Sequence, residues 1–164
     1  MITSFKKIIV KKRTPQKILL LIAIFILSCM QTTYAEKINN IRYLDSGKVL
    51  PPGFPLAEAV RVDNMLYVSG MVGFVPGTKG LAPGGIKAET KQTMINIKTI
   101  LEAHNYSLDN LIRCRVMLAD IAEWGTFNEA YQTFFSDHYP ARAAFGVSGL
   151  ALGARVEVEC AAAK

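Results

Sequence analysis

The sequence contains few of the residues that build metal and nucleotide sites. Its 164 residues include two histidines, His104 and His138, and three cysteines, which show no metal-ligand spacing. The glycine-rich stretch at residues 73–80 places Thr before Lys, whereas a phosphate-binding loop needs the reverse order. Residues 146–149 fall one position short of a Gly-x-Ser-x-Gly nucleophile elbow. We therefore expect no metal site, no nucleotide loop and no serine nucleophile.

Acidic residues are absent from the first 35 positions, which hold six lysines and arginines. The whole chain has 19 basic and 13 acidic residues, so residues 36–164 carry 13 of each and are neutral overall. A neutral body lacks the positive field on which non-specific nucleic-acid binding depends. The sequence therefore predicts no nucleic-acid partner.

The basic start and the apolar run after it are typical of an export signal. The run at residues 18–30 has 13 positions, too few to span a bilayer comfortably. Small residues before position 36 favour cleavage after Ala35, giving a signal peptide at 1–35 and a mature domain at 36–164. A lipobox ending in Cys29 and an uncleaved anchor are the alternatives. All three predict a periplasmic or secreted body, and we expect no stable membrane insertion unless Cys29 is lipidated.

The mature domain contains two cysteines, Cys114 and Cys160, in a compartment that permits disulfides. Both lie in apolar, β-branched runs where small buried cysteines are common. The separation of their Cα atoms, on which a bridge depends, is not contained in the sequence. We therefore expect two unpaired, buried strand residues, with a disulfide as the alternative.

Turn residues divide the mature domain into short elements. Residues 36–55 are polar and turn-rich, so we expect an arm with little regular structure there. Strands are predicted at 60–62, 65–70, 111–118, 141–147 and 155–161, and helices at 87–104 and 123–136. This order predicts an α+β fold with a single mixed β-sheet and two helices on one face. The other face also needs cover, which favours an oligomer.

Two charged residues lie inside predicted strands, where a buried charge is costly unless it has a partner. Arg142 is surrounded by small and apolar residues, and Glu157 lies between Val156 and Val158. The planar guanidinium of arginine binds a carboxylate through two parallel hydrogen bonds, so Arg142 is a candidate anchor for a small anion. The structural alternative is that Arg142 pairs with Glu157 or Glu159, or extends to solvent.

Several segments together resemble the RidA family, also called YjgF, in order and spacing. They are PAR at residues 140–142, VEV at 156–158, NEAY at 128–131, FF at 134–135 and NMLYVSG at 64–70. The resemblance spans about residues 50–163. It implies a chorismate-mutase-like fold and a homotrimer with ligand clefts between subunits. It also implies hydrolysis of reactive enamines and imines, such as 2-aminoacrylate and 2-imino acids, to 2-oxo acids and ammonia without a cofactor.

The resemblance implies a role for each matching residue. Arg142 anchors the substrate carboxylate and fixes the imine carbon next to a water molecule. Glu157 holds and polarises that water, and a pKa raised by burial helps it to accept a proton near neutrality. Ser69 and Asn128 match positions that line or support the family cleft. A strand-end hydroxyl and a helix-capping or supporting amide are their structural alternatives.

Two positions depart from the family pattern. Leu56 stands where catalytic members commonly carry a cleft tyrosine, so a hydroxyl is missing and the cleft is more apolar. Ala144 stands where many members have a cysteine, and there the family chiefly uses the backbone carbonyl. Both positions are substrate-binding candidates. An alanine is compatible with a role of the backbone carbonyl, whereas the more apolar cleft around Leu56 predicts a shifted substrate preference.

The main alternative to an enzyme is a non-catalytic module. In that alternative a trimer uses Arg142 to hold a small carboxylate or an amino acid without chemistry. RNA cleavage, which is reported for some relatives, is disfavoured by the neutral body and by the export signal. The sequence therefore predicts a small-molecule carboxylate as the ligand and the chain itself as the protein partner.

Overall fold

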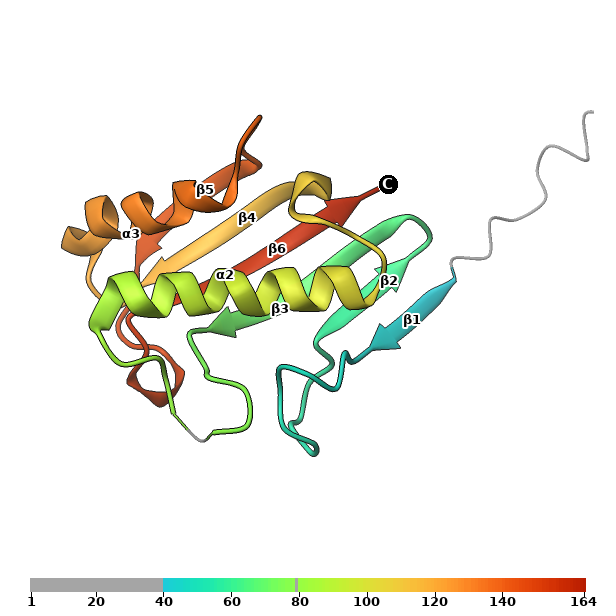
Figure 1. Ribbon diagram of the computed structural model, residues 1–164, viewed down its shortest axis with the longest axis horizontal. Coiled ribbons are helices and arrows are strands. Elements are labelled where there is room, and N and C mark those ends of the chain that lie inside the picture. Colours follow the sequence, from blue (N-terminus) through green and yellow to red (C-terminus); the bar gives the residue numbers. More distant parts are fainter. Residues whose placement is uncertain (1–39, 79) are drawn as a thin grey trace, which may run out of the picture. The chain divides into compact units, whose positions relative to one another are not determined.

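The computed structural model describes residues 40–78 and 80–164, which belong to one compact unit (Figure 1). The signal peptide predicted at residues 1–35 and the lipobox at Cys29 lie outside the described residues. In the part of the chain that is described, no helix has the length and apolar character needed to cross a bilayer. The domain boundary at position 36 stays a prediction.

The fold is built on one mixed β-sheet. Its strands are β1 (Ile41–Leu44), β2 (Ala59–Val62), β3 (Met65–Val72), β4 (Leu111–Leu118), β5 (Ala141–Gly146) and β6 (Val156–Ala163). They lie in the order β1-β2-β3-β6-β4-β5, with β4 and β5 parallel and all other neighbours antiparallel. The five strands expected from the sequence all form, within two residues of their predicted ends.

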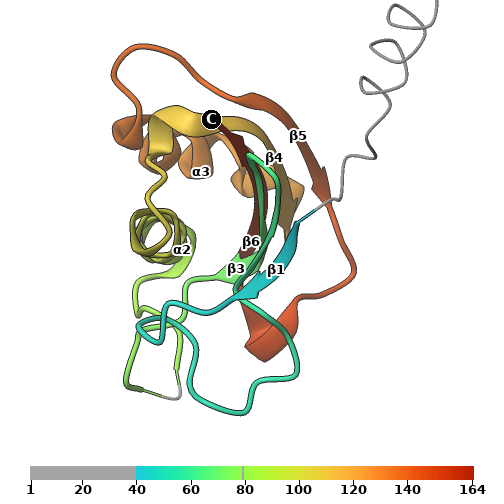
Figure 2. The same cartoon turned by 90° about the vertical axis from the view of Figure 1, so that its right-hand side faces the viewer.

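Two helices, α2 (Gly85–Ala103) and α3 (Trp124–Tyr131), cover the same face of this sheet (Figure 2). This arrangement confirms the predicted α+β fold. Met94, Ile97 and Leu101, which the 3.6-residue period places on one face of α2, are fully buried. The second predicted helix is shorter than expected, because its ends tighten into 3₁₀ turns at Ile121–Glu123 and Gln132–Phe134.

The arm predicted at residues 36–55 contains an unexpected strand, β1, which pairs with β2 at the edge of the sheet. Three of its four residues are exposed. Such a strand is stabilised by backbone hydrogen bonds to its neighbour and shows no buried face, so side-chain alternation does not reveal it. The buried Glu58 fixes the chain between β1 and β2. Its carboxylate accepts hydrogen bonds from the backbone N–H of Ser46 at 2.6 Å and of Leu50 at 2.8 Å.

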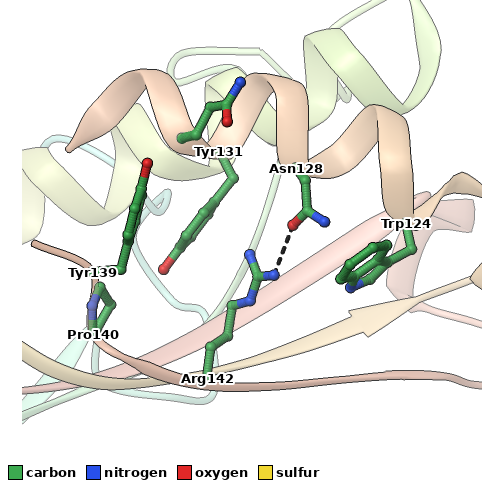
Figure 3. Close-up of a pocket in the computed structure, with 7 residues that line it drawn as sticks. Trp124, Asn128, Tyr131, Tyr139, Pro140 and Arg142 are labelled. Atoms are coloured by element: carbon green, nitrogen blue, oxygen red, sulfur yellow. Dashed lines mark hydrogen bonds between the residues drawn. The ribbon is translucent and has the colours of Figure 1, made fainter. Parts of the chain in front are cut away.

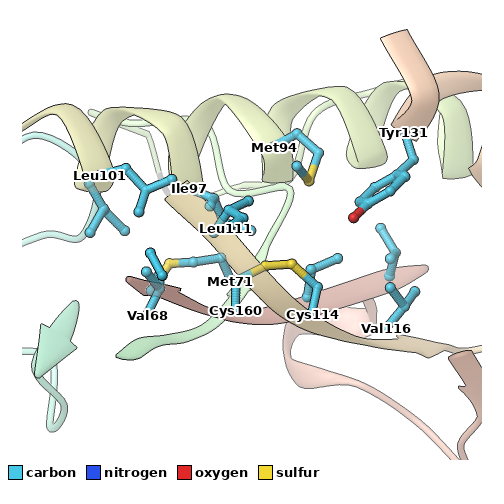
Figure 4. Packing of buried hydrophobic residues seen from close by; sticks show 14 of the residues in the cluster. Val68, Met71, Met94, Ile97, Leu101, Leu111, Cys114, Val116, Tyr131 and Cys160 are labelled. Atoms are coloured by element: carbon cyan, nitrogen blue, oxygen red, sulfur yellow. A yellow bond between two sulfur atoms is a disulfide. The ribbon is translucent and has the colours of Figure 1, made fainter. Parts of the chain in front are cut away.

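Cys114 and Cys160 form a disulfide inside the hydrophobic core (Figure 4). They lie directly opposite each other on β4 and β6, with their Cα atoms 4.1 Å apart. The expectation of two unpaired cysteines was therefore wrong, although both are buried strand residues as predicted. The bond depends on β4 and β6 being neighbours, and a separation of 46 residues along the chain does not indicate that pairing.

Removing this disulfide is expected to destabilise the fold. A cross-link across 46 residues restricts the unfolded chain, so Cys114→Ala/Cys160→Ala should lower the free energy of unfolding by roughly 4 kcal/mol. Urea unfolding of the oxidised protein, the double variant and the reduced wild type measures the loss. We expect the reduced protein and the double variant to behave alike. A double variant as stable as the oxidised wild type would contradict the expectation.

Candidate functional site

Arg142 on β5 and one side of α3 enclose a pocket of about 480 Å³, here called the arginine pocket (Figure 3). Trp124, Asn128 and Tyr131 recur at helical spacing, which places them on the side of α3 that faces β5. The pocket is lined by Trp124, Asn128, Tyr131, Gln132, Tyr139, Pro140 and Arg142. The helix α3, the 3₁₀ turn after it, the segment that precedes β5 and the start of β5 therefore build a cavity around the guanidinium of Arg142.

The guanidinium of Arg142 has no acidic partner within residues 40–78 and 80–164. Its Nη2 donates a hydrogen bond to Oδ1 of Asn128 at 2.7 Å, and its Cζ lies 4.7 Å from the ring centroid of Tyr131. Glu159, one of the acids considered as a partner, binds Arg115 at 2.9 Å instead. The amide of Asn128 orients the guanidinium without neutralising it, so its charge is available to an anion.

Tyr131 packs against the guanidinium and remains neutral at physiological pH. Burial raises the pKa of its hydroxyl to about 12; the Arg142 cation opposes this shift and Tyr139 adds to it. A neutral ring attracts a cation through its π face without cancelling the charge. Tyr131 therefore supports Arg142 and leaves its positive charge in the pocket.

Glu157 lies in a second pocket, of about 230 Å³, here called the glutamate pocket. Val156 and Val158, its neighbours on β6, are buried in the core beneath the helices. Alternation along the strand therefore directs Glu157 to the opposite face of the sheet. The glutamate pocket is lined by Glu157, Gly70, Asn96 and nine apolar residues, namely Val49, Leu50, Phe54, Leu56, Met71, Val72, Phe74, Ala151 and Leu152.

The glycine at position 70 leaves room for the carboxylate of Glu157. Gly70 lies where the register between β3 and β6 shifts, between Val68 and Met71. A Cβ atom at position 70 would overlap Oε1 of Glu157 and would lie 3.1 Å from its Cδ. An alanine at this position is therefore expected to displace the carboxylate, because the end of a glutamate side chain moves more easily than the strand.

The surroundings of Glu157 favour its protonated form. Burial raises the pKa of this carboxyl, and the negative charge of Glu159 raises it further. The direction agrees with the expectation that burial would raise the pKa of Glu157. A carboxylate whose pKa lies closer to neutrality is a better acceptor for a proton from water.

Besides Arg142, two of the four further residues predicted to bind substrate line the pockets. Asn128 lies in the arginine pocket and contacts Arg142, while Leu56, which is 42% exposed, lies in the glutamate pocket with Glu157. Each candidate catalytic residue therefore shares a pocket with one predicted substrate-binding residue: Arg142 with Asn128, and Glu157 with Leu56. Within one protomer these are two separate pockets.

The other two predicted residues support the surrounding structure. The hydroxyl of Ser69 donates a hydrogen bond to the carbonyl of Ala57 at 2.7 Å and so fixes the segment that carries Leu56. Ala144 packs against the hydrophobic core and lines neither pocket. Direct contact of Ser69 or Ala144 with substrate stays a prediction.

Arg142 and Glu157 are not brought together by a single chain. The side chain of Arg142 extends toward α3 on the helix-covered face, whereas Glu157 leaves the sheet on the other face. The structural alternative of an Arg142–Glu157 ion pair is therefore not observed. Within one protomer the two side chains line separate pockets.

Several lining residues were not identified from the sequence. Trp124 precedes Asn128 by four residues, so its helical spacing could have indicated a shared face. Gly70 and Leu152 come next to Glu157 only through the arrangement of the strands and loops. Among the described residues, no group of three or more histidine, cysteine or acidic side chains could hold a metal ion.

Comparisons with known proteins identify the family. Residues 48–164 match the family model described as Endoribonuclease L-PSP. Over 108 residues the chain is 44% identical to 2-iminobutanoate/2-iminopropanoate deaminase of Mus musculus, which covers 66% of this chain and 80% of the mouse protein. The solved structure of RidA from an Antarctic Psychrobacter is 35% identical with a TM-score of 0.71, covering 75% of this chain and 99% of that one.

A second solved structure, E. coli TdcF with bound serine, is 25% identical to the chain with a TM-score of 0.70. It covers 75% of this chain and 98% of its own. The family match includes every residue that lines the two pockets. On these grounds the chain belongs to the RidA family.

Proposed function

We propose that the protein is a hydrolytic deaminase of reactive enamines and imines, of the 2-iminobutanoate/2-iminopropanoate deaminase type. It converts 2-imino acids, including those that form from 2-aminoacrylate, to 2-oxo acids and ammonia. The observation that carries the proposal is the guanidinium of Arg142, which lines a pocket and has no acidic partner in the described part of the chain. The name of the mouse relative supports the same reaction.

The reaction needs a fixed substrate carboxylate, an activated water and a proton for the departing nitrogen. Arg142 binds the carboxylate and so positions the imine carbon. Glu157 accepts a proton from water while the water oxygen bonds to that carbon and the C=N π electrons move to nitrogen. Glu157 then passes that proton to nitrogen, which gives a carbinolamine. As the C–N bond breaks, the hydroxyl proton is transferred to the departing nitrogen, leaving a 2-oxo acid and ammonia. The sequence of steps is redox-neutral.

This chemistry requires the two pockets to meet, and we propose that they do so in a homotrimer. The arginine pocket of one protomer then faces the glutamate pocket of the next. Support comes from the two faces on which Arg142 and Glu157 leave the sheet, and from apolar side chains on its open face. Tyr67 and Phe145 on that face are 49% and 43% exposed in the single chain, a cost that a partner subunit removes. Sedimentation of the purified protein measures the number of subunits.

The second candidate function is a trimeric module that binds a small carboxylate or an amino acid without turnover. The specific observation in its favour is that E. coli TdcF was solved with bound serine. The arginine pocket also lies within one protomer, so anion binding does not depend on Glu157. The family model's description names an endoribonuclease, but the balanced charge of residues 36–164 supports a small molecule over RNA.

Competition for a 2-imino acid tests the proposed function. An L-amino-acid oxidase generates the imine, and semicarbazide traps what is not hydrolysed. A deaminase lowers the yield of semicarbazone in proportion to its own concentration. An unchanged yield, together with calorimetric binding of a 2-oxo acid, would replace the enzyme with the binding module. An unchanged yield without binding would remove both.

We also propose that the protein works outside the cytoplasm. The basic, then apolar, start of the sequence supports a signal peptide, and a disulfide such as Cys114–Cys160 persists in oxidising compartments. The mass of the isolated protein distinguishes a new N-terminus at Glu36 from a lipidated Cys29 and from the uncleaved chain. An uncleaved, non-lipidated chain found in the cytoplasm would contradict export.

A further inference from the structure

Among the described residues that line the glutamate pocket, one polar group has free hydrogen-bonding capacity, the carboxylate of Glu157. The other polar side chain of this described lining, Asn96, already has hydrogen-bond partners. Its Nδ2 donates to the carbonyls of Val72 at 3.2 Å and Phe74 at 2.8 Å, and its Oδ1 accepts from Gln92 at 2.9 Å. Around Glu157 the pocket is therefore an apolar chamber of about 230 Å³.

Leu152 forms part of this chamber in a conformation that leucine rarely adopts. Its φ is 59°, in the left-handed region, and its side chain is 63% exposed. Burial in the core therefore does not compensate for the backbone strain. Leu152 and Phe54 line both the glutamate pocket and an adjoining cavity of about 660 Å³. An exposed apolar side chain held under strain beside a candidate catalytic group points to contact with a ligand.

We propose that the glutamate pocket is a side-chain subsite that selects 2-imino acids with aliphatic or aromatic side chains, and that Leu56 and Leu152 determine this selection. The inference rests on the proposed function, because it places the imine carbon beside Glu157. The carboxylate is bound by Arg142 on one side of that carbon, so the substrate side chain extends into the space on the other side.

The lining of the chamber explains the direction of the selection. Each methylene that enters it gains free energy by leaving water, and the methyl group of 2-iminopropanoate leaves most of the volume unused. A charged side chain loses its hydration there, and the one polar group left free among the described lining residues, the carboxylate of Glu157, is used to hold the water in the proposed reaction. An acidic side chain is also repelled by the carboxylate of Glu157. The order of preference is therefore apolar and large, then small, then acidic.

Turnover of three imines tests this order. The imines of leucine, alanine and glutamate are generated by amino-acid oxidases, and kcat/KM is corrected for spontaneous hydrolysis. We expect the leucine imine to be hydrolysed at least about tenfold more efficiently than the alanine imine, and the glutamate imine least efficiently. Equal efficiencies, or a preference for the alanine or glutamate imine, would overturn the inference.

Variants of Leu56 and Leu152 test whether these two residues determine the preference among substrate side chains. Asparagine adopts the left-handed region readily, so Leu152→Asn keeps the backbone conformation while making the wall polar. We expect this variant, and separately Leu56→Asn, to lower the leucine-to-alanine efficiency ratio by about tenfold. The matched control is Ile95→Asn, because Ile95 on α2 is 47% exposed and lines neither pocket. Ratios equal to the control's in both variants would overturn the assignment.

Calorimetry separates a failure of this inference from a failure of the proposed function. The probes are 4-methyl-2-oxopentanoate, pyruvate and 2-oxoglutarate, which need no turnover. Turnover of all three imines with no preference among their side chains would contradict the proposed subsite and leave the deaminase proposal standing. Binding in the expected order without turnover would overturn the enzyme and support the subsite. Absence of both binding and turnover would overturn the two together.

Discussion

Replacing Glu157 by glutamine is expected to lower kcat/KM by roughly 10²- to 10⁴-fold, the usual contribution of a general base. Glutamine keeps the shape of the side chain but cannot accept the proton that water must lose. Substrate still binds through Arg142, so we expect the loss mainly in kcat. Steady-state measurement with the leucine and alanine imines separates kcat from KM. A variant with wild-type kcat would show that water is activated elsewhere.

The pH dependence should identify Glu157 as the base. Activity requires the carboxylate, so kcat/KM rises as pH passes through the pKa of Glu157. Burial, followed by the charge of Glu159, raises this pKa, and the rise occurs at higher pH than for an ordinary glutamate. We expect this rise of kcat/KM with pH to be absent in Glu157→Gln. Glu159→Gln is the matched control on the same strand. It should keep activity, and the rise of kcat/KM should occur at lower pH because the negative charge of Glu159 no longer raises the pKa of Glu157.

Stability should change in the opposite sense to activity. Because burial raises the folded-state pKa of Glu157, protonated Glu157 contributes stability below its unfolded pKa of about 4.3, and this contribution is lost as pH rises through the folded-state pKa. Glutamine does not ionise. We therefore expect Glu157→Gln to match wild type in acid and to be more stable than wild type near neutrality, as measured by urea unfolding.

Gly70→Ala provides a second test of whether the carboxylate of Glu157 is the catalytic base. The added methyl group overlaps Oε1 of Glu157 and pushes the carboxylate away from its place beside β3. We expect a fall in kcat that approaches that of Glu157→Gln, with the fold retained and Glu157 still ionisable. A Gly70→Ala variant with full activity would show that the position of the carboxylate seen here is not the active one.

Replacing Arg142 by alanine is expected to lower kcat/KM by roughly 10²- to 10³-fold. Two charge-assisted hydrogen bonds to the substrate carboxylate are lost, at about 1.5 to 3 kcal/mol each before the remaining contacts adjust. The same variant should lose calorimetric binding of 2-oxo acids. Arg142→Lys keeps the charge without the planar fork, so we expect an intermediate loss.

Removal of an exposed arginine provides the control for Arg142→Ala. Arg42 on β1 is exposed and lines neither pocket, so Arg42→Ala changes the net charge equally without touching the proposed site. We expect wild-type kinetics from it. If Arg142→Ala binds 2-oxo acids as tightly as Arg42→Ala does, the guanidinium does not anchor the substrate.

The sequence predicted those parts of the fold whose pattern is local. The buried face of α2 follows from the spacing of Met94, Ile97 and Leu101, and the strand at 111–118 from alternation. It also singled out Arg142 and Glu157, because a charge within an apolar strand stands out among its immediate neighbours. Edge strand β1 was missed because its exposed side chains have no such pattern.

By itself, then, the sequence determined the helices, most of the strands, the family and the two charged groups on which the proposed chemistry depends. Tertiary structure decided that Cys114 meets Cys160, that Gly70 makes room for Glu157, and that Arg142 and Glu157 face away from each other. The physical reason is the range of the interactions. Periodicity is carried by residues a few positions apart, whereas strand order and pocket walls arise from contacts between segments far apart in the chain.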